Sequence, residues 1–317
     1  MSEYRIGVVG ATGAVGTVTL ELLGARGLGH VRAFASARSA GRRVPYAHGE
    51  LEVEEATPEA LAAGDLDLCF FSVGTDTSRE LVPYAERGGA LCIDKSDAYR
   101  LTESVPLVVA GVNDSALERG SDRIVANPNC SAIQLACVLR PLEDAAGLDR
   151  VRLATYQAAS GAGDAAVERL HGIAPGQADL SMDWELDGDE FSEEFKLRAE
   201  TRKILDLPEL PLHATCVRVP VRVGHAQAVW VETRERLSPE QARSVLAGAP
   251  HVALEDLPTP GSAAGRDEVL VGRIREDSAQ PKNGLALWVV CDNLRKGAAL
   301  NAIQIAELLL ARQALPA

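Results

Sequence analysis

The apolar positions follow two different patterns along the chain. Up to residue 126 they form short, continuous apolar runs that are separated by helical segments. The runs predict strands over residues 4–9, 30–35, 66–73, 90–93 and 123–126, with a helix after the first strand and another over residues 77–87. Continuous apolar strands that alternate with helices are typical of a parallel sheet buried on both faces. The fold class is therefore α/β, and the N-terminal part is predicted to be a Rossmann-type doubly wound parallel sheet.

After residue 150 the apolar residues alternate with polar ones. The alternating runs cover residues 151–157, 216–223, 226–234 and 285–291. Such runs predict the longer strands of a mixed or antiparallel sheet. An acidic segment at 176–188, a charged helix-prone stretch at 190–205 and a final amphipathic helix at 298–312 complete the second part. We therefore expect a second domain of the α+β type.

A glycine-rich turn follows the first strand. Its residues are Gly10, Ala11, Thr12, Gly13, Ala14, Val15 and Gly16. Glycines let the backbone turn sharply and approach a pyrophosphate, which the N-terminus of the next helix then holds through its N–H groups and dipole. Plain strand-to-helix turns also use glycine, but the position directly between a strand and an amphipathic helix favours a dinucleotide site.

The second predicted strand ends in hydroxyl and basic residues rather than in an acidic one. Ser36, Arg38 and Ser39 lie where a dinucleotide domain specific for NAD has an aspartate or glutamate for the ribose 2′-hydroxyl. Hydroxyl groups and a guanidinium suit the 2′-phosphate of NADP instead. The alternative is an ordinary solvated loop. We predict NADP as the cofactor.

Cys130 lies at a junction between a short strand and a helix. The apolar residues after it recur at helical spacing, so a helix is predicted to begin close to Cys130 and to end before Pro141. Asn129 is a suitable N-cap. A thiol in the first turn is exposed to the positive end of the helix dipole, which favours the nucleophilic thiolate. A small buried thiol is the alternative, and the local pattern alone does not separate the two.

Composition narrows the functional classes. The 317 residues include 45 acidic and 32 basic side chains, which gives a net charge of −13. This charge opposes non-specific binding to nucleic acid or to an anionic membrane. The six cysteines lack the spacing of a metal site, and the N-terminal residues contain neither a basic segment nor a long apolar one that would direct export. We expect a cytoplasmic protein that uses no metal and acts on small molecules.

Eight segments, taken together, resemble bacterial aspartate-semialdehyde dehydrogenases and occur in that family's order. They are GATGAVG (10–16), SARSAG (36–41), ANPNCS (126–131), YQAASGAG (156–163), EEFK (193–196), ETRKIL (200–205), CVRVPVRVGH (216–225) and DNLRKGAALNAIQIAE (292–307). The resemblance implies a dinucleotide-binding domain at 1–128, completed by residues 295–317, and a catalytic and dimerisation domain at 129–294. It also implies a homo-oligomer, at least a dimer.

The resemblance further implies a reaction, the reversible phosphorylating oxidation of L-aspartate 4-semialdehyde to L-aspartyl 4-phosphate with NADP. Cys130 matches the nucleophile that forms a thioester, and His225 matches the general acid/base, whose ordinary pKa suits proton transfer near neutrality. Asn129 and the N–H of Cys130 are candidates to stabilise the oxyanion, and Gln157 matches a residue beside the reacting carbon. The matching substrate and cofactor residues are Arg218 for the α-carboxylate, Glu194 for the α-amino group, Arg100 and Lys196 for phosphate, and Gly10, Thr12, Gly13, Ala14, Val15, Ser36, Arg38, Ser39, Ser160, Gly161 and Asn293 for NADP.

Two other functions compete with this interpretation. An N-acetyl-glutamyl-phosphate reductase would use the same thioester chemistry on a longer, acylated substrate. A catalytically silent paralogue would bind NADP without turnover. The segments around Cys130 and His225 argue against both, because they match the dehydrogenase and retain its nucleophile and its histidine.

Overall fold

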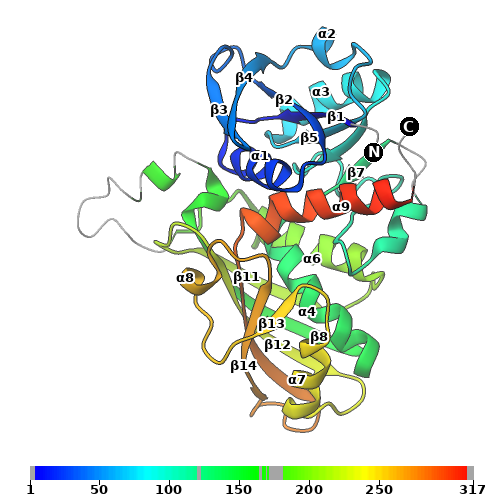
Figure 1. Cartoon of the computed structure of the whole chain (residues 1–317). Helices are drawn as coiled ribbons and strands as arrows, with labels where there is room; N and C mark the ends of the chain where they lie inside the picture. Colours follow the sequence, from blue (N-terminus) through cyan, green and yellow to red (C-terminus); the bar gives the residue numbers. More distant parts are fainter. Residues whose placement is uncertain (1–3, 120–122, 164–165, 169, 171–180, 313–317) are drawn as a thin grey trace. The chain divides into compact units, whose positions relative to one another are not determined.

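The computed structural model describes residues 4–119, 123–163, 166–168, 170 and 181–312 of the chain. The chain divides into two compact units (Figure 1). Unit 1 consists of residues 1–128 and 298–317, and unit 2 consists of residues 129–297. The C-terminal contribution to unit 1 therefore begins at Ala298 rather than at the expected residue 295.

Unit 1 is built on a seven-stranded sheet with the order β3-β4-β2-β1-β5-β6-β7. The strands are β1 (Tyr4–Val9), β2 (Gly29–Ala35), β3 (Arg43–Tyr46), β4 (Gly49–Glu55), β5 (Leu68–Phe71), β6 (Leu91–Asp94) and β7 (Ile124–Ala126). Every pair is parallel except β3 with β4, so the predicted parallel sheet is confirmed. The hairpin of β3 and β4 escaped prediction because it lies at the sheet edge and is largely exposed, without a continuous apolar run.

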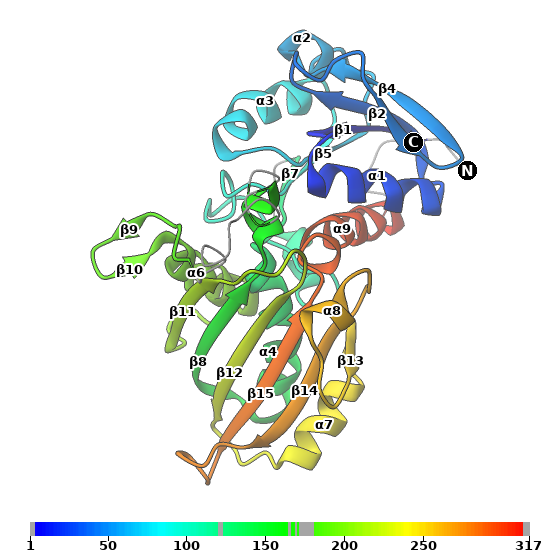
Figure 2. The same ribbon diagram turned by 90° about the vertical axis from the view of Figure 1, so that its left-hand side faces the viewer.

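Helices cover both faces of this sheet. They are α1 (Ala14–Arg26), α2 (Pro58–Leu61), α3 (Thr75–Arg87) and α9 (Leu300–Ala311). The connection from β1 to β2 and the connection from β5 to β6 run in opposite directions across the sheet. Right-handed crossovers in opposite directions place α1 and α3 on opposite faces, as Figure 2 shows. The C-terminal helix α9 packs beside α1 and against β6, so it completes the core of unit 1.

Unit 2 contains a six-stranded sheet with the order β11-β8-β12-β15-β14-β13. Its strands are β8 (Leu148–Gln157), β11 (Leu212–Arg218), β12 (His225–Thr233), β13 (Val252–Leu254), β14 (Val269–Glu276) and β15 (Gly284–Cys291). Parallel and antiparallel pairs both occur, which confirms the predicted mixed sheet. The other elements are α4 (Cys130–Ala146), α6 (Ser192–Leu205), α7 (Pro239–Ala247), α8 (Pro260–Ala263) and a hairpin of β9 (Leu186–Asp187) and β10 (Glu190–Phe191).

Helix α4 is the central helix of unit 2, lying across β8, β12 and β15 and beside α6 (Figure 2). It continues to Ala146, so the prediction that it ends before Pro141 was wrong. A proline inside a helix costs about 3 kcal/mol. Burying Leu142 and Ala146 in the next turn offsets much of this, since a fully buried leucine side chain contributes about 1.5–3 kcal/mol.

Two further differences concern loops. The alternating run predicted as a strand over 216–223 leaves the sheet after Arg218, and the next strand begins at His225. Of the predicted acidic segment 176–188, residues 176–180 lie outside the described residues. Within the described ranges, no helix is long and apolar enough to cross a membrane.

Candidate active site

The glycine turn of unit 1 packs tightly against the start of α1. Gly10 has a φ of +84°, a conformation that side chains other than glycine rarely adopt. A Cβ added at Gly16 would lie 2.0 Å from the carbonyl oxygen of Gly10, so the helix approaches the turn as closely as the backbone allows. Gly13 is the N-cap and places no side chain over the first N–H groups of α1. This is the arrangement in which a helix N-terminus receives a phosphate group.

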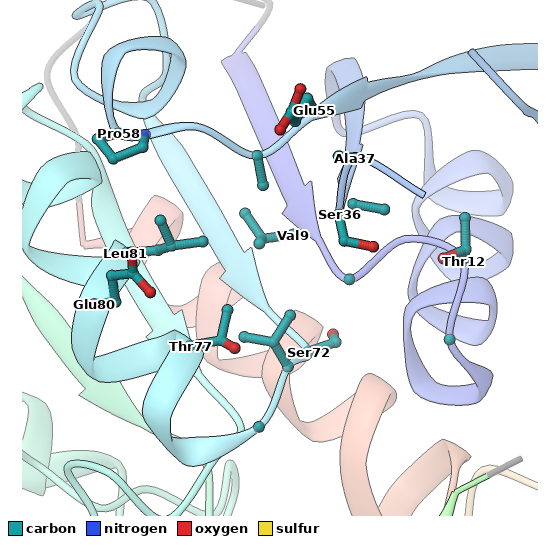
Figure 3. Close-up of a pocket in the computed structure, with 16 residues that line it drawn as sticks. Val9, Thr12, Ser36, Ala37, Glu55, Pro58, Ser72, Thr77, Glu80 and Leu81 are labelled. Carbon is teal, nitrogen blue, oxygen red and sulfur yellow. The ribbon is translucent and has the colours of Figure 1, made fainter. Parts of the chain in front are cut away.

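A cavity of about 540 Å³ opens at the carboxyl ends of the parallel strands of unit 1 (Figure 3). Among the predicted cofactor residues, Gly10, Thr12, Gly13 and Ser36 line it. The predicted residues Ala14, Val15, Arg38 and Ser39 are not among its lining residues. The volume is that of a small-molecule site, and the position is where open parallel sheets bind ligands. The cavity and the glycine turn beside it therefore fit the phosphates and one nucleoside of a dinucleotide.

Several lining residues were missed by the sequence analysis. Ala37 and Glu55 lie on one side of the cavity in Figure 3, next to the predicted Ser36, and Thr77 and Glu80 project from α3 on the other. Glu55 ends β4, and because β4 was not predicted, no pattern along the chain placed Glu55 beside the second strand. Thr77 and Glu80 could have been found from their position in the helix that follows β5, because that strand end also faces the ligand side of a parallel sheet.

Two basic residues of unit 1 are held at the ends of β6 and β7. Arg100, a predicted phosphate ligand, donates from Nε to the carbonyl of Asn127 at 3.0 Å and from Nη2 to that of Lys95 at 2.6 Å. Lys95 donates from Nζ to Oγ1 of Thr19 on α1 at 2.7 Å. Burial lowers the pKa of Lys95 to about 7. Arg100 is thus fixed by main-chain carbonyls, which orient its guanidinium.

In unit 2, strand register gathers side chains from four neighbouring strands into one row. Arg218 of β11 pairs with Gln157 of β8, and His225 of β12 pairs with Cys291 of β15. The antiparallel register of β8 with β12 puts Gln157 beside His225. Paired residues point to the same face. The row therefore brings together three of the predicted site residues, Arg218, Gln157 and His225.

Helix α4 covers the face that carries this row. Gln227, two residues after His225 on the same face, donates to the carbonyl of Ser131 in the first turn of α4 at 2.9 Å. Cys130 is the first residue of α4 and is partly exposed. A Cβ added at Gly297 would lie 3.1 Å from Cβ of Cys130, so the chain passes close to the thiol there. The predicted nucleophile is thus at a helix N-terminus, beside the row of polar side chains.

A buried carboxylate links two of the predicted catalytic amides. Oε1 of Glu193 accepts hydrogen bonds from Nδ2 of Asn129 and from Nε2 of Gln157, each at 3.0 Å. The Oδ1 atom of Asn129 caps α4 by accepting from the N–H of Ser131 at 2.8 Å. The Asn129 side chain therefore acts first as a cap and a link to Glu193. Asn129 was also predicted to stabilise the oxyanion, and only the second N–H of its side-chain amide remains for that role.

Glu200 supports the same end of the helix. Its Oε2 accepts from the main-chain N–H of Asn129 at 2.6 Å, and the residue is 1% exposed. The sequence analysis assigned no role to Glu193 or Glu200, although each begins a segment that resembles the family and their spacing offered a signal. The two glutamates are seven residues apart, which places them on one face of α6 together with the buried residues Leu197 and Ile204.

Glu194 has a different environment from the one predicted. Its Oε2 accepts from the N–H of Phe191 at 2.9 Å, and its Oε1 accepts from the N–H of Cys216 at 2.8 Å. Both oxygens therefore hold main-chain groups of α6 and β11. These contacts argue against the predicted role of Glu194 in binding an amino group, and they leave Glu193 as the glutamate that faces Gln157.

His225 is completely buried and neutral. Its Nδ1 accepts from the N–H of Ala158 at 3.0 Å, so the imidazole proton is on Nε2. Nε2 has no hydrogen-bond partner within the described part of the chain. Burial and, secondly, the charge of Arg218 lower the pKa of His225 to about 3. The expectation of an ordinary pKa near neutrality was therefore wrong, because the imidazole is desolvated beside a cation.

The predicted residues Ser160, Gly161 and Asn293 surround this imidazole. Oδ1 of Asn293 accepts from the N–H of Gly224 at 2.9 Å, and its Nδ2 donates to Oγ of Ser160 at 2.9 Å. A Cβ added at Gly161 would lie 3.0 Å from Nε2 of His225. Asn293 thus fixes the turn before His225, and the missing side chain at Gly161 leaves room at Nε2.

Arg218 and Lys196 complete the predicted set in unit 2. Arg218 is 8% exposed, and its Nη1 donates to the carbonyl of Ala158 at 3.0 Å. Lys196 lies on α6 two residues after Glu194 and is partly exposed. Across the described residues, no group of three or more histidine, cysteine, aspartate or glutamate side chains could hold a metal ion. The candidate site of unit 2 thus combines a thiol, a buried imidazole, amides and a fixed guanidinium.

Family models of known proteins match both parts of the chain. A family model described as semialdehyde dehydrogenase, NAD binding domain, matches residues 5–119, and one described as semialdehyde dehydrogenase, dimerisation domain, matches residues 178–296. An aspartate-semialdehyde dehydrogenase of Corynebacterium melassecola is 44% identical over 96% of this chain and 99% of the relative.

Solved structures show the same fold. Aspartate semialdehyde dehydrogenase II from Vibrio cholerae, complexed with ASA, has a TM-score of 0.93 and 37% identity over 98% of this chain and 99% of that chain. Aspartate semialdehyde dehydrogenase from Candida albicans, solved with NADP, has a TM-score of 0.81 and 26% identity over 98% of this chain and 99% of that chain.

Limited alkylation should identify Cys130 as the most reactive of the six thiols. The other five cysteines are buried, and burial raises the pKa of each of them, in the case of Cys216 to about 12. Since the thiolate is the reacting species, substoichiometric iodoacetamide at neutral pH should label Cys130 roughly 100-fold faster than any other cysteine. Peptide mass spectrometry measures this directly, and a first label on Cys69 or Cys216 would contradict the assignment.

Proposed function

Because the chain belongs to the aspartate-semialdehyde dehydrogenase family, we propose that it catalyses the reversible phosphorylating oxidation of L-aspartate 4-semialdehyde with NADP, through a thioester on Cys130. The observation that carries this proposal is the position of Cys130. It is the partly exposed thiol at the start of α4, beside the row of Gln157, His225 and Arg218. The two rival interpretations are disfavoured, since the relatives match nearly the whole chain.

The thiolate of Cys130 attacks the aldehyde carbon, and the resulting hemithioacetal carries the charge that develops on the substrate oxygen. The dinucleotide supplies the hydride acceptor when it is bound. Loss of hydride leaves a thioester on Cys130, and phosphate displaces the sulfur to give the acyl phosphate. The N-terminal N–H groups of α4 and the dipole of that helix stabilise both the thiolate and the oxyanion.

His225 acts in this scheme as a neutral hydrogen-bond donor. Its Nε2–H is buried, and no described residue accepts it. A buried donor without a partner is costly, and active sites are where such groups are kept for a reacting atom. With a pKa of about 3, the imidazole remains uncharged at neutral pH and donates Nε2–H to the substrate oxygen.

The remaining roles concern the charged groups of the substrates. Arg218 takes the α-carboxylate, because a guanidinium binds a carboxylate in bidentate fashion. Glu193 is favoured over Glu194 for the α-amino group, since its oxygen faces Gln157 and Asn129. Arg100 and Lys196 remain our candidates for phosphate. Their assignment rests on the family motif in the sequence.

We also assign NADP rather than NAD as the preferred cofactor. The end of β2 carries no acidic residue, and exposed Arg38 directly follows Ser36 and Ala37, which line the cavity. The related Candida albicans enzyme was solved with NADP. The match to a dimerisation domain supports a homo-oligomer, for which we propose a homodimer in the cytoplasm, where six free thiols remain reduced.

The purified protein should form NADPH when semialdehyde, phosphate and NADP are all present. Cys130→Ser should lower kcat at least about 1000-fold, because a serine hydroxyl is far less ionised than a cysteine thiol near neutral pH. Cys216→Ser, a matched change at a buried thiol, should retain activity. Turnover of an N-acetylated glutamate semialdehyde instead would support the first rival, and NADP binding without turnover of either substrate would support the second.

Exchanging the two neighbouring glutamates for glutamine should separate their roles. Glu193→Gln should lower kcat/KM for the semialdehyde about 10- to 150-fold, the equivalent of 1.5–3 kcal/mol for a hydrogen bond to a charged group. Glu194→Gln should instead lower the thermal midpoint while the folded enzyme keeps its kcat/KM. Steady-state kinetics and thermal unfolding test this, and similar kinetic losses in both variants would refute the distinction.

Replacing Arg38 by alanine should weaken NADP binding by about 1.5–3 kcal/mol, the range for a charged hydrogen bond, and leave NAD binding nearly unchanged. Arg42→Ala is the matched control, since Arg42 is exposed in the same loop and loses the same charge. Titration calorimetry with each cofactor decides. Equal losses for NADP and NAD would show that Arg38 does not contact the 2′-phosphate.

A further inference from the structure

The main chain of Arg218 is hydrogen-bonded on both sides. On one side β11 pairs with β8, where Arg218 lies opposite Gln157. On the other side Arg218 and Ser181 exchange two hydrogen bonds, at 2.8 and 3.0 Å. The chain that follows Ser181 therefore starts beside Arg218, and it reaches the guanidinium two and three residues later.

Asp183 and Trp184 contact the Arg218 side chain from this segment. Nε of Arg218 donates to Oδ1 and Oδ2 of Asp183, at 2.9 and 3.2 Å. The guanidinium carbon lies 4.7 Å from the centroid of the Trp184 ring, which packs against its face. The Trp184 ring in turn contacts Phe191 of β10, with centroids 6.4 Å apart. The hairpin of β9 and β10 thus supports a platform under the guanidinium.

These contacts use particular donors of Arg218. An arginine has five N–H donors, one on Nε and two on each Nη. Asp183 takes the Nε donor and the carbonyl of Ala158 takes one on Nη1. Among the contacts made by the described residues, both N–H groups of Nη2 and one of Nη1 are left for a ligand. A carboxylate can bind an arginine at its Nε edge or at its Nη edge. Asp183 occupies the Nε edge, so the donors that remain for a carboxylate are those on the two Nη nitrogens.

We propose that Asp183 and Trp184 are positioning residues that restrict Arg218 to binding the substrate's α-carboxylate through its Nη edge. The inference rests on the proposed function, because it takes Arg218 as the carboxylate clamp. Asp183 fixes the guanidinium within its plane, and Trp184 fixes the orientation of that plane. Together they set the direction from which the substrate's carboxylate approaches, and they hold the guanidinium in this orientation before the substrate binds.

The charge of Asp183 has a second consequence. Arg218 has a side chain that is 9% exposed, whereas that of Asp183 is 34% exposed. The Asp183 carboxylate, which lies nearer the solvent, therefore compensates the charge of the buried Arg218 guanidinium. Competition between Asp183 and the substrate for the clamp is the opposing hypothesis. The two would bind different edges of the guanidinium, so the geometry favours positioning over competition.

Steady-state kinetics of Asp183→Asn, with the semialdehyde varied at saturating phosphate and NADP, tests the proposal. KM for the semialdehyde should rise about 5- to 20-fold, less than for a fully buried charged pair because Asp183 is a third exposed. The value of kcat and the KM for phosphate should change by less than about twofold. Asp187→Asn, the same charge change at an exposed position of the same hairpin, should leave all three constants unchanged.

Two outcomes of this experiment would overturn the proposal. A lower KM in Asp183→Asn would show that Asp183 competes with the substrate for Arg218. An unchanged KM would show that the contact does not position the clamp. For the aromatic platform, Trp184→Ala should raise KM as Asp183→Asn does, and Trp184→Phe should restore most of the loss because it keeps a ring against the guanidinium.

A double-mutant cycle shows whether Asp183 acts through Arg218. Lysine has no Nε edge, so in the Arg218→Lys background a further Asp183→Asn change should alter KM by less than about twofold. Additive losses would overturn the proposal. If the wild-type protein forms no NADPH from semialdehyde, the proposed function has failed. If the wild type is active and Arg218→Lys is impaired while Asp183→Asn is normal, positioning alone has failed.

Discussion

The register of β11, β8, β12 and β15 is the constraint on which unit 2 depends. It sets the row of polar side chains under α4, and these are Arg218, Gln157, His225 and Cys291. Because side chains alternate between the two faces of a sheet, a slip of one residue would turn a member of the row to the opposite face. The hydrogen bond from Gln227 to the carbonyl of Ser131 joins this face to the start of α4. Register therefore fixes which of these residues are neighbours before any side chain adopts its rotamer.

Buried charge is the second constraint, and it explains why the site is built from linked pairs. An isolated carboxylate in the core would cost far more than a hydrogen bond returns, so Glu193 and Glu200 are each bound by N–H groups at the start of α4. Arg218 is balanced by Asp183 in the same way. His225 needs no charged partner, because its lowered pKa keeps the buried imidazole neutral. In a protein with a net charge of −13, anionic substrates must be bound by such local cations.

The sequence predicted the architecture well where the apolar pattern is strong. The parallel sheet of unit 1 and the mixed sheet of unit 2 are confirmed, because buried strands leave continuous or alternating apolar runs. The β3–β4 hairpin and Glu55 at its end were missed, since an exposed edge leaves no such pattern. The end of α4 was misplaced because tertiary burial of Leu142 outweighed the local effect of Pro141.

The site was predictable by residue type but not by contact. The resemblance to the family pointed to Cys130, Gln157, His225 and Arg218. Strand register gathers the last three on one face of the sheet, and Cys130 begins the helix that covers this face. It could not separate Glu193 from Glu194, because adjacent helical residues differ only in the direction they point, and that direction depends on how α6 packs against α4 and β11. The lowered pKa of His225 was equally hidden, since desolvation arises only when distant segments bury the ring.

The space at His225 depends as much on absent side chains as on present ones. A Cβ at Gly161 would lie 3.0 Å from Nε2, in the space that the proposed function gives to the substrate oxygen. Gly224 has a φ of +102°, and a Cβ there would lie 2.7 Å from the carbonyl of Pro260, so no other residue fits the turn that leads into β12. Gly161 thus keeps the space beside Nε2 open, and Gly224 allows the turn that places the imidazole there. Gly161 lies in the segment 156–163 and Gly224 in the segment 216–225. Backbone geometry requires a glycine at each of these positions, so the same short segments specify both the fold and the candidate site.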